Sequence, residues 1–225
     1  MPKILGLFDS FDNLDSISVD SLAIFLKSVS VNISTIQLEN YLANRILYPQ
    51  TLPLTEIDMK IDLGILREVL RIYGPKFSDK FSKPLLGDNP FINITLRKII
   101  IPRKFLYFIP NLTNLSWAFV DGLLLDRKKE DWFEDLWTVV LSDDNEETVG
   151  SVILPQFNSG DDIMELFLLG KSYKIRPGSL TLVSCNKERC EIAYKFSNGM
   201  LLGKKENAVE ISGGKLGVLV DGRIK

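Results

Sequence analysis

The sequence predicts an α+β fold, with a helical and mixed region over residues 1–145 and a small antiparallel β-barrel or sandwich over residues 146–225. Segments before residue 145 place apolar residues at the three- and four-residue spacing of amphipathic helices. Later segments are short alternating apolar runs separated by Gly, Pro and Asn. With 225 residues, 45% of them hydrophobic, the chain can bury a sizeable core.

Three helices are expected in the first half of the chain. The first is carried by "VDSLAIFLKSV". The second begins at Ser34, which with Gln37 has the spacing of a capping box. Its residues expected to face inward are Ile36, Tyr41, Leu42 and Ile46. The third helix follows Thr55 as N-cap, has its inward face starting at Ile57, and is expected to end at Gly74–Pro75.

The middle of the chain is predicted as one or two strands, a further mixed segment and another helix. "PFINITLRKIIIP" has the β-branched runs of a strand, and "NLTNLSWAFVDGLLLD" reads as a helix followed by a strand. "KKEDWFEDLWTVVL" begins with acidic residues, as a helix does, and carries Trp132, Phe133 and Trp137. We expect this aromatic helix to be an interaction surface.

The closing stretch "SGGKLGVLVDGR" raises the question of a phosphate-binding loop. Lys215 follows Gly214, but no Ser or Thr follows the lysine, and the apolar run that comes next is typical of a strand. A phosphate loop also needs a helix after it. We therefore predict a hairpin-type turn at Gly213 and Gly214, then a strand, with Asp221–Gly222 opening another turn.

Composition excludes several classes of catalytic and metal site. The chain has no histidine, which removes Ser-His-Asp and Cys-His mechanisms and the usual zinc ligand sets. No cofactor and no metal are expected. Cys185 and Cys190 are either two partly buried thiols beside a hairpin loop or a disulfide, and their spacing does not decide between the two. No export signal and no membrane span are recognised, so a cytoplasmic location is expected.

A basic cluster is interleaved with aromatic residues near the middle of the chain. Its members are Arg97, Lys98, Arg103 and Lys104. Basic and aromatic residues together are typical of surfaces that bind single-stranded nucleic acid. The net charge of -2 argues against nucleic acid as the main partner, and the other interpretation is a strand with charged ends.

Three stretches together resemble glutamate mutase L (methylaspartate mutase accessory) proteins. The first is "YLANRILYPQTLPLTEIDMKIDLGILREVLRIYG", whose residues that match the family pattern are Tyr48, Pro49, Thr51, Pro53, Thr55, Arg67, Leu70 and Arg71. "VGSVILPQ" and "VEISGGKLGVLVDGR" resemble two later strands of the family. The resemblance implies the fold of the actin-like ATPase superfamily and covers most of residues 15–225, least well between residues 76 and 145.

The departures from that family concern its nucleotide site. The amino-terminal Asp-x-Gly-Thr-Thr loop has no counterpart, which suggests that the chain corresponds to a carboxy-terminal half. The family's second glycine-rich stretch falls on "FINITLRKIIIP", which contains no glycine. We therefore expect a non-catalytic accessory or scaffold protein without an ATP site, whose partner is another protein subunit, with a separately encoded actin-like half as one candidate. The alternative is a β-barrel module that binds nucleic acid or a small ligand.

Overall fold

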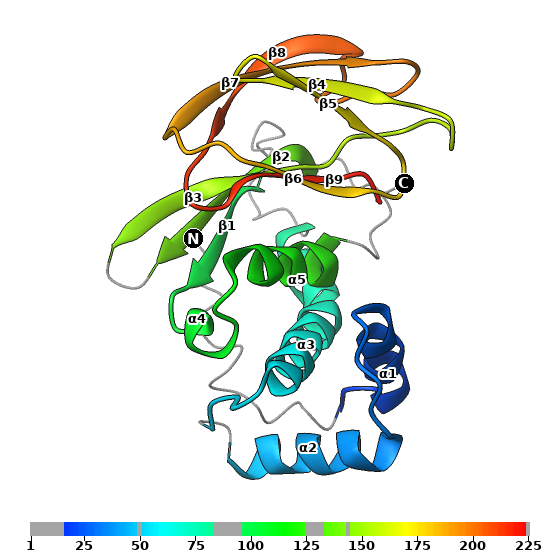
Figure 1. Ribbon diagram of the computed structural model, residues 1–225, viewed down its shortest axis with the longest axis vertical. Helices are drawn as coiled ribbons and strands as arrows, with labels where there is room; N and C mark the ends of the chain where they lie inside the picture. The colour runs from blue at the N-terminus through cyan, green and yellow to red at the C-terminus, as the bar shows by residue number, and fades with distance from the viewer. Residues whose placement is uncertain (1–15, 49–50, 83–95, 125–132, 143–144, 224–225) are drawn as a thin grey trace. The chain divides into compact units, whose positions relative to one another are not determined.

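The computed structural model describes residues 16–48, 51–82, 96–124, 133–142 and 145–223. They form two compact units (Figure 1). The helical unit comprises the described residues of Met1–Phe91 and Pro102–Arg127, and the sheet unit comprises those of Ile92–Ile101 and Lys128–Lys225. The structure thus groups two strands from before residue 145 with the later strands, whereas the sequence-based division at 145 grouped them with the helices.

The helical unit contains five helices. They are α1 (Val19–Ser28), α2 (Thr35–Leu47), α3 (Glu56–Ser82), α4 (Phe105–Phe108) and α5 (Leu112–Leu124). The capping box predicted for α2 is confirmed, because the Ser34 hydroxyl accepts from the amide of Gln37 while the Gln37 side chain accepts from the amide of Ser34. The Thr55 hydroxyl likewise accepts from the amide of Asp58 at 3.1 Å, which starts α3 where the sequence predicted.

The long helix α3 organises this unit, because α1 and α5 both pack against it. Gly122 of α5 allows the close approach, since a Cβ atom there would lie 2.5 Å from Cβ of Leu70. An ion pair between Arg67 and Asp121 joins the same two helices. The prediction that α3 ends at Gly74–Pro75 was wrong. A proline removes one backbone donor from a helix, and here α3 continues to Ser82 despite that loss.

The sheet unit contains nine strands in two sheets (Figure 1). They are β1 (Leu96–Pro102), β2 (Phe133–Ser142), β3 (Glu146–Ile153), β4 (Met164–Leu168), β5 (Lys171–Ile175), β6 (Leu180–Val183), β7 (Arg189–Phe196), β8 (Glu206–Ser212) and β9 (Gly217–Asp221). The sheet orders are β1-β2-β3-β9-β6 and β5-β4-β7-β8. Neither sheet closes into a barrel, so that part of the prediction is not supported, while the α+β class agrees with the structure.

The two sheets share one apolar core, in the manner of a sandwich. Ile153, Val218 and Val220 from the five-stranded sheet belong to the same buried cluster as Leu166 and Ile192 from the four-stranded sheet. The expectation of a purely antiparallel arrangement was wrong, because β3 and β9 are parallel. Strand β9 follows a crossing from the other sheet, and its direction is therefore not set by a hairpin with its neighbour.

The predicted aromatic helix covered residues 128–141, and its described part, from Phe133 on, is instead strand β2, which pairs antiparallel with β3 from Leu136 to Ser142. Acidic residues at its start suggested a helix, but its second half contains the β-branched residues Thr138, Val139 and Val140. β-Branched side chains are restricted in a helix and pack well on a sheet. Pairing with β3 therefore outweighs the helix-like charge pattern.

Candidate protein-binding site

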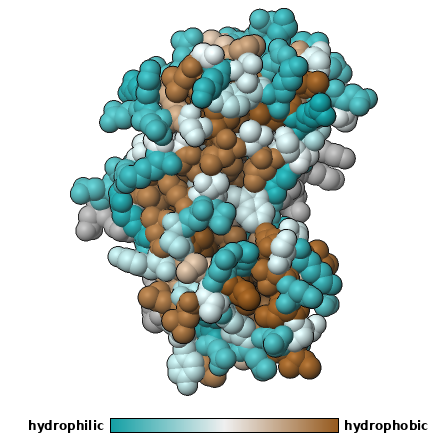
Figure 2. Space-filling model, viewed as in Figure 1, coloured by the Kyte–Doolittle hydropathy of each residue, from teal (hydrophilic) through white to brown (hydrophobic). Residues whose placement is uncertain are grey.

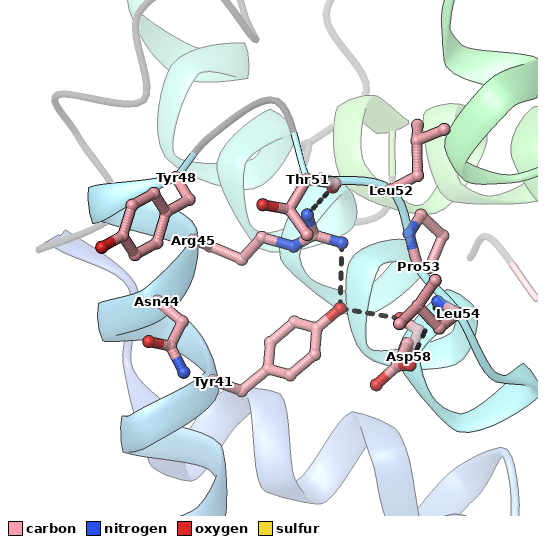
Figure 3. A pocket seen from close by; sticks show the side chains of 9 residues that line it. All are labelled: Tyr41, Asn44, Arg45, Tyr48, Thr51, Leu52, Pro53, Leu54 and Asp58. Carbon is pink, nitrogen blue, oxygen red and sulfur yellow. Dashed lines mark hydrogen bonds between the residues drawn. The ribbon is translucent and has the colours of Figure 1, made fainter.

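A pocket lies where α2 ends, where the connector over residues 51–55 crosses it and where α3 begins (Figure 3). Its volume is about 280 Å³. The lining residues are Tyr41, Asn44, Arg45, Tyr48, Thr51, Leu52, Pro53, Leu54 and Asp58. Pro53 has a fixed φ and no amide donor, and so keeps this connector extended rather than helical. All the lining residues belong to the helical unit.

The pocket is built on a polar cluster of the buried Arg45 and Asp62 and the half-buried Tyr41. Nε of Arg45 donates to Oδ1 of Asp62 at 2.9 Å, and Nη2 of Arg45 also pairs with Oδ2 of the same carboxylate. The Tyr41 hydroxyl donates to Oδ1 of Asp62 at 3.0 Å and accepts from Nη2 of Arg45 at 3.0 Å. Bidentate pairing of this kind fixes the guanidinium in one orientation.

The remaining donor group of Arg45 ties the cluster to the connector. Nη1 donates to the backbone carbonyl of Thr51, which lies on the far side of the pocket (Figure 3). The Arg45 guanidinium also lies 5.3 Å from the centre of the Tyr41 ring, within the range of a cation–π contact. Arg45 therefore holds α2, the connector and α3 together, through Thr51 and Asp62.

Burial shifts the titration of this cluster. It raises the pKa of Asp62 from 3.8 to about 6, although the Arg45 charge and the hydrogen bonds from Arg45 and Tyr41 oppose the rise. Burial together with the negative charge of Asp62 raises the pKa of Tyr41 far above its ordinary value. Asp62 is thus mostly ionised at neutral pH and loses its charge in mildly acidic solution.

Large apolar side chains are exposed along this part of the chain. We call Leu47, Tyr48, Leu52, Leu54 and Ile57 the connector surface; their exposed fractions are 68%, 64%, 50%, 89% and 55%. Three of them line the pocket, and the other two flank those in sequence. Hydrophobic side chains are visible at the surface of the helical unit in Figure 2. Single exposed apolar residues are ordinary, but a group of large ones around a hollow is typical of a binding surface.

The lining of the pocket combines a paired cation, one carboxylate and an apolar surface. Arg45, the cation of the lining, is engaged with the buried Asp62, Asp58 is the acidic lining residue, and most of the remaining lining is apolar. Within the described part of the chain, no group of three or more acidic or cysteine side chains is arranged to hold a metal ion. The pocket is slightly smaller than the sites that bury drug-sized ligands, and suits one bulky side chain.

The residues that the sequence predicted as an interaction site occur in both units. Trp137 lies in β2 and is 4% exposed, so it does not form an exposed aromatic face; Phe133 begins the same strand, and Trp132 lies outside the described residues. Arg97 and Lys98 are in β1 of the sheet unit, and Lys98 pairs with Glu146 at 2.6 Å.

Arg103 and Lys104 form the turn before α4, in the helical unit, and are half-buried. The four basic residues are therefore divided between the two units, two in each. The nucleic-acid interpretation rests on all four acting as one cluster, and it stays a prediction.

The glycine stretch is a crossing between sheets and not the predicted hairpin turn. It connects β8 of the four-stranded sheet to β9 of the five-stranded sheet. Gly214 has φ 133°, a conformation that side chains rarely adopt. Gly213 approaches the Cys185–Cys190 loop so closely that a Cβ atom would lie 2.5 Å from the carbonyl oxygen of Cys185. The predicted strand after the turn is confirmed as β9.

The cysteines and the closing turn complete this region. Cys185 and Cys190 form a disulfide, the alternative that their spacing had left open, and both residues are buried. A disulfide is uncommon in the reducing cytoplasm, and the cytoplasmic location stays a prediction. Asp221 is fully buried and accepts from the amide of Arg223 at 3.0 Å, while the Gly222 amide donates to Ser179.

Sequence analysis missed the connector surface. It placed Ile36, Ile46 and Ile57 facing inward, yet Ile36 and Ile57 are well exposed and Ile46 is more than one-third exposed. The prediction for Leu42 is confirmed, and the buried face of α2 also contains Leu38 and Arg45. A signal was present in "YPQTLPLT", where Leu52 and Leu54 occur in an extended proline-rich connector that has no periodicity to bury them.

Comparison of the chain with protein families, with curated proteins and with solved structures found no match. The described helices include none that is both long and apolar enough to cross a lipid bilayer. The function proposed below therefore rests on the geometry and chemistry of the described residues.

Proposed function

We propose that this chain is a non-catalytic accessory or scaffold protein that binds another protein through the connector surface. The observation that carries the proposal is the exposure of Tyr48, Leu52 and Leu54 around one pocket. Full burial of an exposed leucine side chain is worth about 1.5–3 kcal/mol, and a protein partner would recover the share that these side chains leave in water. Aromatic and aliphatic anchors beside a pocket are also typical centres of protein interfaces.

The accessory role agrees with the resemblance to the carboxy-terminal half of glutamate mutase L proteins. That resemblance implies a partner subunit, and a separately encoded actin-like half is the candidate we propose. The non-catalytic part rests on the glycine-free stretch "FINITLRKIIIP", where the family has a glycine-rich loop. Binding or hydrolysis of ATP by the purified chain with ordinary affinity would contradict this part alone.

The experiment is affinity capture from native lysate with chemical crosslinking, comparing Leu54→Ser with Ile24→Ser. Both substitutions remove a largely exposed aliphatic side chain, and Ile24 lies on α1, outside the connector surface. We expect a partner to be captured by the wild-type chain and by Ile24→Ser, and to be lost with Leu54→Ser. Equal capture by the two variants would show that the connector surface is not the binding site.

A further inference from the structure

The charges that line the pocket determine which partner segment it accepts. Arg45 does not attract an acidic partner, because Nε, Nη1 and Nη2 all donate to Asp62, Thr51 or Tyr41. Both Arg45 and Asp62 are about 95% buried, and their charges cancel at neutral pH. The pair therefore contributes little net charge to the pocket opening.

Asp58 provides the uncompensated charge. Its Oδ2 atom accepts from the amides of Leu54 at 3.2 Å and Thr55 at 2.9 Å. Oδ1 of Asp58 accepts no hydrogen bond among those found within the described residues. The amino-terminal end of α3 offsets about half an elementary charge, so net negative charge remains at this side of the pocket. Glu56, two residues before Asp58, is instead paired with Lys60 at 2.9 Å.

The apolar part of the pocket complements this charge with a place for a side chain. Tyr48, Leu52, Pro53 and Leu54 surround a volume of about 280 Å³. The Tyr41 hydroxyl and the Arg45 guanidinium meet at its centre and satisfy each other, so an apolar group entering the pocket leaves neither without a partner (Figure 3). The pocket is thus suited to a bulky hydrophobic residue rather than to a polar one.

We infer that the connector surface takes a partner peptide segment in which a bulky apolar anchor fills the pocket and an adjacent Lys or Arg pairs with Asp58. This inference rests on the proposed function and specifies the chemistry of the partner. The apolar contacts supply most of the affinity, and the cation selects among apolar segments. An acidic neighbour to the anchor would meet like charge and be disfavoured.

The test uses three capped dipeptide amides, acetyl-Phe-Lys, acetyl-Phe-Glu and acetyl-Ser-Lys, titrated at millimolar concentration into the isotope-labelled full chain. Two-dimensional NMR follows the backbone amides of Thr51, Leu54 and Asp58. We expect acetyl-Phe-Lys to shift these amides, acetyl-Phe-Glu to bind about threefold more weakly, and acetyl-Ser-Lys to cause almost no shift. If neither acetyl-Phe-Lys nor acetyl-Phe-Glu shifts these amides, the pocket assignment is overturned.

Two matched variants separate the charge from the fold. Asp58→Asn keeps an oxygen that accepts from Leu54 and Thr55 but removes the charge, so we expect the preference for Lys over Glu to disappear. Glu56→Gln removes a charge from the same turn of α3, outside the pocket lining, and is expected to keep the preference. If Asp58→Asn retains the full preference, Asp58 is not the recognising group.

Different outcomes contradict the peptide preference and the binding surface. A preference that is absent or reversed in the wild-type chain overturns the inference, while loss of capture with Leu54→Ser would still support the proposed function. Concentration-dependent dimerisation that shifts the same three amides without any probe would identify a second copy as the occupant, and would also overturn the inference. Equal capture by Leu54→Ser and Ile24→Ser overturns the proposed function itself.

Discussion

Replacing Arg45 with methionine tests the buried cluster beneath the pocket. Methionine keeps much of the apolar volume of the side chain but removes the bonds to Asp62, Tyr41 and the Thr51 carbonyl. Breaking a buried ion pair from one side costs about 3–5 kcal/mol of folding free energy, because the other charge is left without compensation. We expect a loss within this range at neutral pH.

The pH dependence of that loss follows from the pKa of Asp62. In the wild-type chain, burial raises it from 3.8 to about 6, so this carboxyl group favours folding most below pH 4, and its contribution falls as the pH rises towards 6. Removing Arg45 takes away the positive charge and the hydrogen bonds that lower this pKa, and therefore raises it further. Above pH 6 the variant must either keep the proton or bury an unpaired charge.

The extra cost grows by about 1.4 kcal/mol for each pH unit above the wild-type pKa. Between about pH 5 and about pH 7.5, the difference in unfolding free energy between wild type and Arg45→Met should increase by roughly 2 kcal/mol. Urea denaturation followed by far-UV circular dichroism at both pH values measures it.

A control is Lys98→Met, which breaks the partly exposed pair with Glu146 and should cost no more than about 1 kcal/mol. A cost for Arg45→Met that stays constant, or that is larger at the lower pH, would refute the linkage between Arg45 and Asp62.

Two further substitutions test the sheet unit by the same urea denaturation. Gly213→Ala should cost about 2 kcal/mol, because the new Cβ would collide with the carbonyl oxygens of Cys185 and Lys187, whereas Gly160→Ala, where nothing lies within 4 Å, should be nearly neutral; equal effects would contradict the close packing. Tyr194→Phe removes a buried hydrogen bond of 2.7 Å to the Leu201 carbonyl and should cost about 1–2 kcal/mol, and an unchanged stability would show that this bond adds nothing.

Local patterns predicted the elements that depend on local physics. The capping box of Ser34 and Gln37 is a contact within one helical turn, so a stretch of four residues was enough to identify it. The start of α3 at Thr55 and Asp58 followed for the same reason. Strand β9 was identified from its own run of apolar residues.

Elements that depend on distant partners were predicted less well. The acidic residues before strand β2 are typical of a helix start, whereas the strand forms because it pairs with β3, which the local sequence does not reveal. The crossing at Gly213 and Gly214 was taken for a hairpin because the sequence does not state that β8 and β9 belong to different sheets. Arg45 escaped notice because its partner Asp62 is seventeen positions away on another helix.

The candidate site was missed for a related physical reason. Sequence reasoning assigns apolar residues to the core, and Leu52 and Leu54 would belong there if the connector had a face to bury. Its proline makes it extended, and Arg45 ties it to the helices through a polar contact with the Thr51 carbonyl. These leucines therefore contribute little to the stability of the isolated chain. Apolar side chains that folding does not require are best accounted for by association, which is why the connector surface, and not the aromatic strand β2, carries the proposed function.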